Sequence, residues 1–142
     1  MSTNLAAKAT TSIEAPRSKV WEALVAPDAI EQYMFGTRVE SNWTAGSKIT
    51  WQGEWNGKKY EDRGVILKFY PEQTLQYTHF SPLSGGPDTP ENYHTVTINL
   101  SGDGNSTDVS LSQDNNADEK ARGESEKNWV AMLEGLKKYV EK

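Results

Sequence analysis

The chain has 142 residues, of which 15 are Lys or Arg and 20 are Asp or Glu, so its net charge is −5. This charge repels a phosphate backbone, and we expect no nucleic acid partner. Because the sequence contains no cysteine, disulfides, thiolate chemistry and cysteine-ligated zinc are excluded.

The length fits one domain, which we place at residues 8–142 after a disordered N-terminus of residues 1–7. The first dozen residues have neither the charged head nor the apolar run of a signal peptide. No stretch approaches the roughly 20 apolar residues that span a bilayer. We therefore expect a cytoplasmic protein that does not contact membranes.

The first part of the chain predicts one strand and two short helices. Residues 8–14 are rich in Thr and Ile, which is typical of a strand. Pro16 suits the first turn of a helix, and Pro27 must end that helix because it cannot occupy a helix interior. A second helix is predicted over residues 28–36, where Gly36 ends it.

From residue 46 onward the apolar residues alternate with a period of two. The pattern predicts antiparallel strands over residues 46–55, 58–70, 74–80, 93–100 and 106–113. Asn56-Gly57 is a strong hairpin signal between the first two of these strands. The segment Ser81 to Asn92 contains three prolines and two glycines, and long irregular loops of this kind are often functional.

The C-terminal residues predict one long helix over residues 118–141. Its apolar stripe consists of Trp129, Met132, Leu133, Leu136 and Val140. Gly135 lies beside this stripe, and we expect it to allow a close backbone approach to the sheet.

Four stretches together carry a family resemblance: IEAPRSKVWEALVAPDAIEQYMFG, YEDRGVILKFYPEQTLQYTHF, TVTINLSGDGNSTDVSLSQ and NWVAMLEGLKKYVEK. They resemble the homologues of the heat-shock-protein-90 ATPase activator, within the START and birch-pollen-allergen superfamily. The resemblance implies an α+β helix-grip fold, in which a curved six- to seven-stranded antiparallel sheet wraps around a long C-terminal helix. Two short helices follow the first strand, and a cavity is expected between sheet and helix. The family has no shared catalytic motif to carry over.

The candidate ligand contacts are mostly aromatic. Trp51, Trp55, Tyr77, Trp129 and Met132 lie on the faces expected to meet between sheet and helix, where they could form a pocket wall or, equally, a filled core. The resemblance places Tyr33 and Phe35 near the floor or mouth of the cavity.

Charged and titratable residues supply the polar candidates. Glu61, Asp62 and Arg63 precede Val65, Leu67 and Phe69 on one predicted strand, so one of the charges must face inward and needs a partner. Arg63 paired with Glu61 or Glu54 inside the pocket could orient a polar ligand head; the alternative is a solvated strand end. His79 is a further candidate contact, but neither it nor His94 has a partner at a metal-ligand spacing, so we expect no metal and no cofactor.

Three functions remain open at this point. The first is a non-enzymatic module that holds a small apolar or aromatic ligand, capped by the loop Ser81 to Asn92. The second is regulation of a heat-shock chaperone through protein contacts, with a role in the stress response. The third is an enzyme of the cyclase or hydrolase type. The sequence is compatible with a monomer or a dimer.

Overall fold

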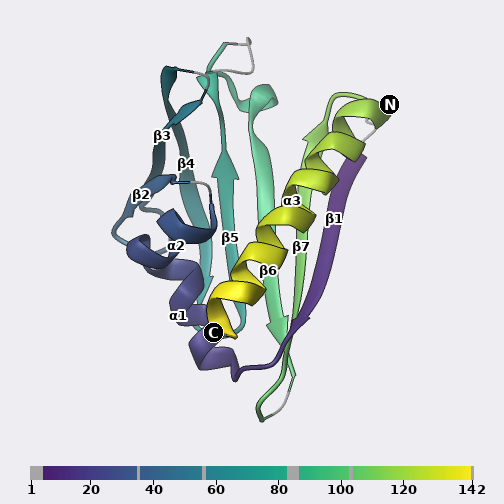
Figure 1. The fold of residues 1–142 in the computed structure, drawn as a ribbon. Coiled ribbons are helices and arrows are strands. Elements are labelled where there is room, and N and C mark those ends of the chain that lie inside the picture. Colours follow the sequence, from purple (N-terminus) through teal and green to yellow (C-terminus); the bar gives the residue numbers. More distant parts are fainter. Residues whose placement is uncertain (1–4, 35, 56, 83–86, 103, 142) are drawn as a thin grey trace.

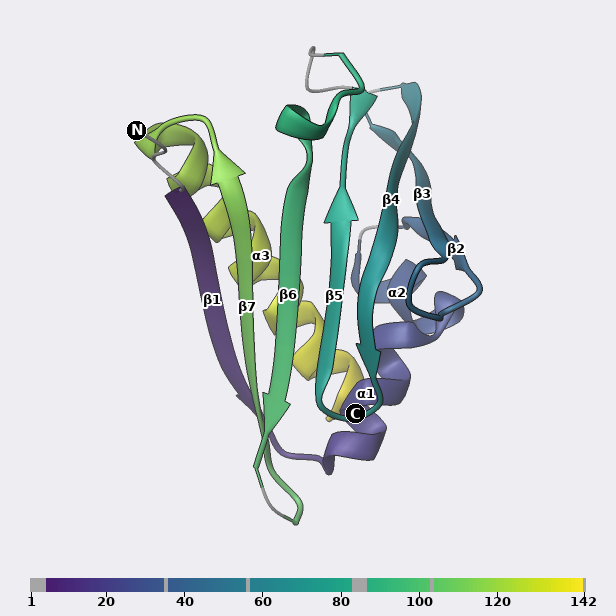
Figure 2. The same cartoon turned by 180° about the vertical axis from the view of Figure 1, so that it is seen from behind.

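The structure is a computed structural model that describes residues 5–34, 36–55, 57–82, 87–102 and 104–141. Seven strands form one antiparallel sheet in the order β1-β7-β6-β5-β4-β3-β2, and the helices cover one face of it (Figures 1 and 2). The elements are β1 (Leu5–Ile13), α1 (Arg17–Val25), α2 (Pro27–Tyr33), β2 (Arg38–Ser41), β3 (Lys48–Trp55), β4 (Lys58–Tyr70), β5 (Thr74–His79), the 3-10 turn η2 (Pro90–Asn92), β6 (His94–Ser101), β7 (Thr107–Asn116) and α3 (Glu119–Val140). The α+β helix-grip architecture expected from the sequence is thus confirmed.

Most boundaries match the sequence pattern, with four differences. α2 ends at Tyr33, before Gly36, and β7 continues to Asn116. β1 begins at Leu5, so residues 5–7 belong to the sheet and not to a disordered terminus. β2 was not predicted, because its four residues are too few for a period to be recognised. Asn56 of the predicted hairpin lies outside the described residues, but the pairing of Trp55 with Lys58 closes β3 onto β4 as expected.

The two short helices are separated by a single extended residue. Ala26 has φ −97° and ψ 116°, and Pro27 occupies the first turn of α2. Proline disfavours helical geometry in the residue before it, which accounts for the break. The Tyr33 hydroxyl donates a 2.9 Å hydrogen bond to the Ala23 carbonyl and so ties α2 back to α1.

The apolar stripe of α3 forms one side of the core. Met132, Leu133, Leu136 and Val140 are buried, as the helical spacing predicted. A Cβ atom added to Gly135 would lie 3.2 Å from the Tyr33 carbonyl oxygen. Gly135 therefore permits the close approach of α3 to α2, and the prediction that it serves an approach to the sheet was wrong.

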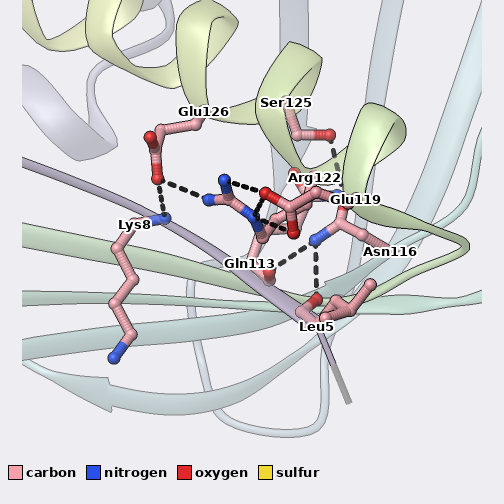
Figure 3. Close-up of polar contacts among 8 residues, drawn as sticks. All are labelled: Leu5, Lys8, Gln113, Asn116, Glu119, Arg122, Ser125 and Glu126. Carbon is pink, nitrogen blue, oxygen red and sulfur yellow. Dashed lines mark hydrogen bonds and ion pairs between the residues drawn. The ribbon is translucent and has the colours of Figure 1, made fainter. Parts of the chain in front are cut away.

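Polar side chains attach the first turns of α3 to β1 and β7 (Figure 3). The Asn116 amide donates to the carbonyl oxygens of Leu5 and Gln113 at 2.8 and 3.1 Å, and its own oxygen accepts from Ser125 at 3.0 Å. Asn116 is buried, and a buried amide is tolerated when its hydrogen bonds are made.

The side of β1 that faces away from β7 receives side chains from α3 along its length. Glu126 accepts a hydrogen bond from the Lys8 N–H at 3.3 Å, and the Lys137 ammonium donates to the Ser12 carbonyl at 2.6 Å. Glu141 accepts from the Glu14 N–H at 2.8 Å; this bond and the Lys137 ammonium hold the pKa of Glu141 below its usual range. Backbone groups at a sheet edge can pair with another chain, so these side chains protect the edge.

No helix in the described part of the chain is both long and apolar enough to cross a bilayer.

The packing of α3 predicts a steep cost for losing one core side chain. Leu136 is 0 % exposed, and Leu136→Ala should lower the free energy of unfolding by about 2–5 kcal/mol because it leaves a cavity. Val130 on the same helix is 46 % exposed, and Val130→Ala should change the free energy of unfolding by less than about 0.5 kcal/mol. Urea denaturation of both variants checks this, and equal losses would contradict the assigned helix face.

Candidate functional site

A cleft of about 620 Å³ opens between α3 and the β3–β4 hairpin. α3 crosses the sheet obliquely, so that its first turns lie over β1 and β7 and its last turns approach α1 and α2 (Figures 1 and 2). The cleft is lined by Met34, Thr37, Glu54, Tyr60, Asp62, Gln113, Ser125, Asn128, Trp129 and Met132. Its volume falls in the range of small-molecule sites, which is roughly 300–1,000 Å³.

Below this cleft the interior is filled. Only about 20 Å³ remains open in the space bounded by Tyr33, Trp51, Tyr77, Met132 and their apolar neighbours. Trp51 and Tyr77 are buried with ring centroids 5.1 Å apart, and burial raises the pKa of the Tyr77 phenol. These two residues are therefore part of the core, which is one of the two arrangements that the sequence left open.

The other predicted aromatic contacts divide between cleft and core. Trp129 and Met132 line the cleft, and the Trp129 indole N–H donates to the Gln113 side-chain oxygen. Tyr33 lies in the core against Tyr139, and burial raises its pKa. Phe35 and the side chain of Trp55 are outside the described residues.

Asp62 is the charged residue of β4 that faces the cleft. Its Oδ2 atom is 2.8 Å from Nε2 of His79, whose ring lies with its centroid 4.9 Å from that of Trp51. The side chains of Asp62 and His79 are only 14 % and 29 % exposed. Oδ1 of Asp62 is buried and has no hydrogen-bond partner among the described residues.

Gly64 allows β4 and β5 to approach closely next to the contact between Asp62 and His79. A Cβ atom at this position would lie 1.7 Å from the Thr78 carbonyl oxygen and 3.3 Å from the His79 backbone nitrogen, so a side chain cannot be accommodated without moving β5. A similar relation holds at Gly53, where an added Cβ would lie 2.5 Å from the Tyr60 hydroxyl.

His94 is the neighbour of His79 across the β5–β6 pair, with ring centroids 6.5 Å apart. Its Nδ1 lies 2.9 Å from the Asp114 carbonyl oxygen, which can only accept, so this nitrogen carries the proton. Within the described ranges, no group of three or more His, Asp or Glu side chains is arranged to hold a metal ion.

The prediction for Arg63 was wrong. Arg63 does not pair with Glu61 or Glu54 inside a pocket; its guanidinium binds Asp88 of the following loop at 3.0 Å, and both side chains are about 40 % exposed. Tyr93 donates to the other Asp88 oxygen at 2.6 Å and stacks on Phe80. Arg63 therefore fastens the described end of the loop to the sheet, at the end of β5 where His79 lies.

The sequence analysis missed most polar residues of the cleft. Tyr60, Gln113, Ser125 and Asn128 come from three separate elements, and no local pattern connects them. The signal for Asp62 was present, because Asp62, Gly64 and Ile66 alternate on one face of β4.

The comparisons with known proteins identify relatives of this fold. The family model of the activator of Hsp90 ATPase homolog 1-like protein matches residues 14–141. A protein from Cytophaga hutchinsonii, solved in solution, is 57% identical over 99% of this chain and 97% of its own, with a TM-score of 0.87. No curated protein sequence matches the chain.

Two more distant structures share the fold alone. The Aha1 dimer from Colwellia psychrerythraea is 19% identical over 96% of each chain, with a TM-score of 0.74. Ara h 8.0201 is 11% identical over 95% of this chain and 96% of its own, also with a TM-score of 0.74.

A Gly64→Ala substitution, which adds one methyl group, tests whether β4 and β5 need this glycine. Gly64→Ala should lower the free energy of unfolding by about 1–3 kcal/mol, because β4 and β5 must move apart, and should shift the His79 ring resonances in NMR spectra. Gly123→Ala in α3 is the control: no atom lies within 4 Å of the added Cβ, and Ala favours a helix by about 1 kcal/mol. A Gly64→Ala protein with native stability and unmoved His79 signals would show that the glycine does not position this pair.

Proposed function

We propose that this chain, which belongs to the family of activator of Hsp90 ATPase homolog 1-like proteins, is a non-enzymatic module that binds a small ligand in the cleft between α3 and the β3–β4 hairpin. The observation that carries the proposal is the cleft itself, about 620 Å³ beside an interior that is almost full. An enclosed cavity deep in the sheet is not part of this proposal.

The composition of the cleft suits a ligand with an apolar body and one polar group. Trp129, Met132 and Met34 give apolar surface, and Gln113 orients the Trp129 indole by accepting its N–H. Thr37 and Tyr60 hydrogen-bond to each other at 3.0 Å, so they form a fixed polar edge. A pre-formed site of this kind loses little conformational freedom when a ligand binds.

The loop after β5 was expected to cap the ligand site, but none of its described residues lines the cleft. Its described end, residues 87–92, is held by the contacts of Asp88 with Arg63 and Tyr93, and by Asn115, whose amide donates to the Glu91 and Tyr93 carbonyls. These contacts fix where the loop returns to the sheet, near the end of β5 and the start of β6.

A substitution that fills the cleft tests the binding role. We expect Asn128→Trp to abolish any thermal stabilisation found in a panel of fatty acids, sterols, flavonoids and small aromatic compounds, because Asn128 is exposed on the cleft wall. A ligand at 100 times its Kd adds about 2.7 kcal/mol, which corresponds to a rise in Tm of roughly 5–10 °C.

Lys127→Trp is the matched control, since Lys127 is exposed on the same helix but does not line the cleft. It should retain the stabilisation. Equal shifts in both variants, or a panel without any shift, would count against the cleft as a ligand site.

Regulation of a heat-shock chaperone is a second candidate, favoured by an apolar patch on the other face of β4. Val65, Leu67 and Tyr70 are exposed there, and Val65 and Leu67 lie on one surface because side chains alternate along a strand. Exposed apolar side chains that lie together are typical of protein contacts.

If this patch binds an Hsp90-type chaperone, Leu67→Glu should weaken the co-purification and any effect on the ATPase rate by about tenfold, because it places a charge in an apolar contact. Lys68→Glu, at the neighbouring exposed position, controls for charge. A purified chaperone whose ATPase rate is unaffected by the unchanged protein would eliminate this candidate.

A further inference from the structure

We propose that the ligand of the cleft is an organic cation, namely an amine with an apolar or aromatic body. The inference depends on the ligand-binding role proposed above and adds the charge of the ligand to it.

The charges that line the cleft all have one sign. Glu54 and Asp62 are carboxylates, and none of the other eight lining residues is Lys, Arg or His. The chain as a whole carries −5. An ammonium group is attracted to this wall and a carboxylate is repelled, and the effect increases as water is displaced from the cleft.

Asp62 contributes more to this selection than Glu54. Asp62 is mostly buried, whereas Glu54 is exposed, and an exposed charge is screened by water and salt. A carboxylate offers about four acceptor positions on its two oxygens. In the described structure Asp62 accepts one hydrogen bond, from His79 to Oδ2, while Oδ1 accepts none.

An ammonium group interacts more strongly with the charge of Asp62 than a hydroxyl group does. It carries up to three N–H donors and a full charge, whereas a hydroxyl group has a single donor and no charge. Asp62 lines the cleft, so an ammonium group bound there lies near its charge, while Oδ1 itself stays buried. His79 holds the carboxylate from the other side and fixes its position.

The aromatic residues of the same wall also favour a cation. Trp129 and Tyr60 both line the cleft, and the faces of such rings attract ammonium groups. The remaining polar residues carry both donors and acceptors and so do not select by charge; they are Thr37, Gln113, Ser125 and Asn128.

The test compares ligands that share one body and differ in one group. Tryptamine, tryptophol and indole-3-propionate form one series, and octylamine, octanol and octanoate form a second. Affinities are measured by isothermal titration at pH 7.5 and 50 mM salt. In at least one series the amine should bind at least tenfold more tightly than the alcohol, and the carboxylate should not bind.

Asp62→Asn should reduce the advantage of the amine over the alcohol to less than threefold. The matched control is Glu61→Gln, which removes the same charge at the next residue, where the side chain bonds Gln52 and does not line the cleft. It should leave the advantage unchanged. If Asp62→Asn does not fold, the titrations of the native protein are repeated at 500 mM salt. Screening should then weaken the binding of the amine and leave the binding of the alcohol unchanged.

The outcomes separate the two proposals. An alcohol or a carboxylate that binds as tightly as its amine, and is lost in Asn128→Trp, overturns the cationic ligand and leaves the binding module standing. An amine preference that survives Asp62→Asn overturns the role of Asp62 in selecting the cation. If no member of either series binds, both the inference and the binding role of the cleft are contradicted.

Discussion

The attachment of α3 to β1 is the interaction on which the rest of the structure depends. Apolar residues hold one side of the helix in the core, while Glu126 and Lys137 bind backbone groups of β1 at Lys8 and Ser12, and Glu141 binds the N–H of Glu14 just after the strand. These contacts keep the first turns of the helix over β1 and β7 and not over the middle of the sheet (Figures 1 and 2). The last turns are supported by α1 and α2, where Gly135 lets the backbones meet.

This oblique placement decides where the protein is filled and where it is open. Under the second half of α3 the space is filled by large aromatic side chains such as Trp21, Trp51 and Tyr77. The first half of α3 packs on β1 and β7, at the opposite side of the sheet from β3, and the cleft opens between the helix and the β3–β4 hairpin. The high aromatic content is therefore used mainly to fill the core, since each ring buries a large area at a small cost in rotamer entropy.

Periodicity predicted the helices, six of the strands and the apolar stripe of α3, because those features are local. It did not predict the inward charge. Val65, Leu67 and Phe69 read as one face of a strand, which would turn Arg63 inward; a register irregularity after Ile66 breaks that face, and Asp62 is inward instead. The partner of Asp62 lies on another strand, and the partner of Arg63 lies in a loop. Contacts between distant segments leave no periodic signal, so the polar side of the cleft could not be predicted from the sequence.

The partly buried charge of Asp62 makes one wall of the cleft acidic. A carboxylate with an unpaired buried oxygen costs about 1–3 kcal/mol, and a neutral Asn would fit the same position on β4. The neighbours of this charge hold it in place: Gly64 lets β4 approach the backbone of β5 closely, His79 lies 2.8 Å from Oδ2, and the Trp51 ring lies against the imidazole. A position that departs from local packing rules while its neighbours support it is typical of a functional site. The charge of Asp62 acts on the cleft because its side chain lines the wall there, even though Oδ1 is buried.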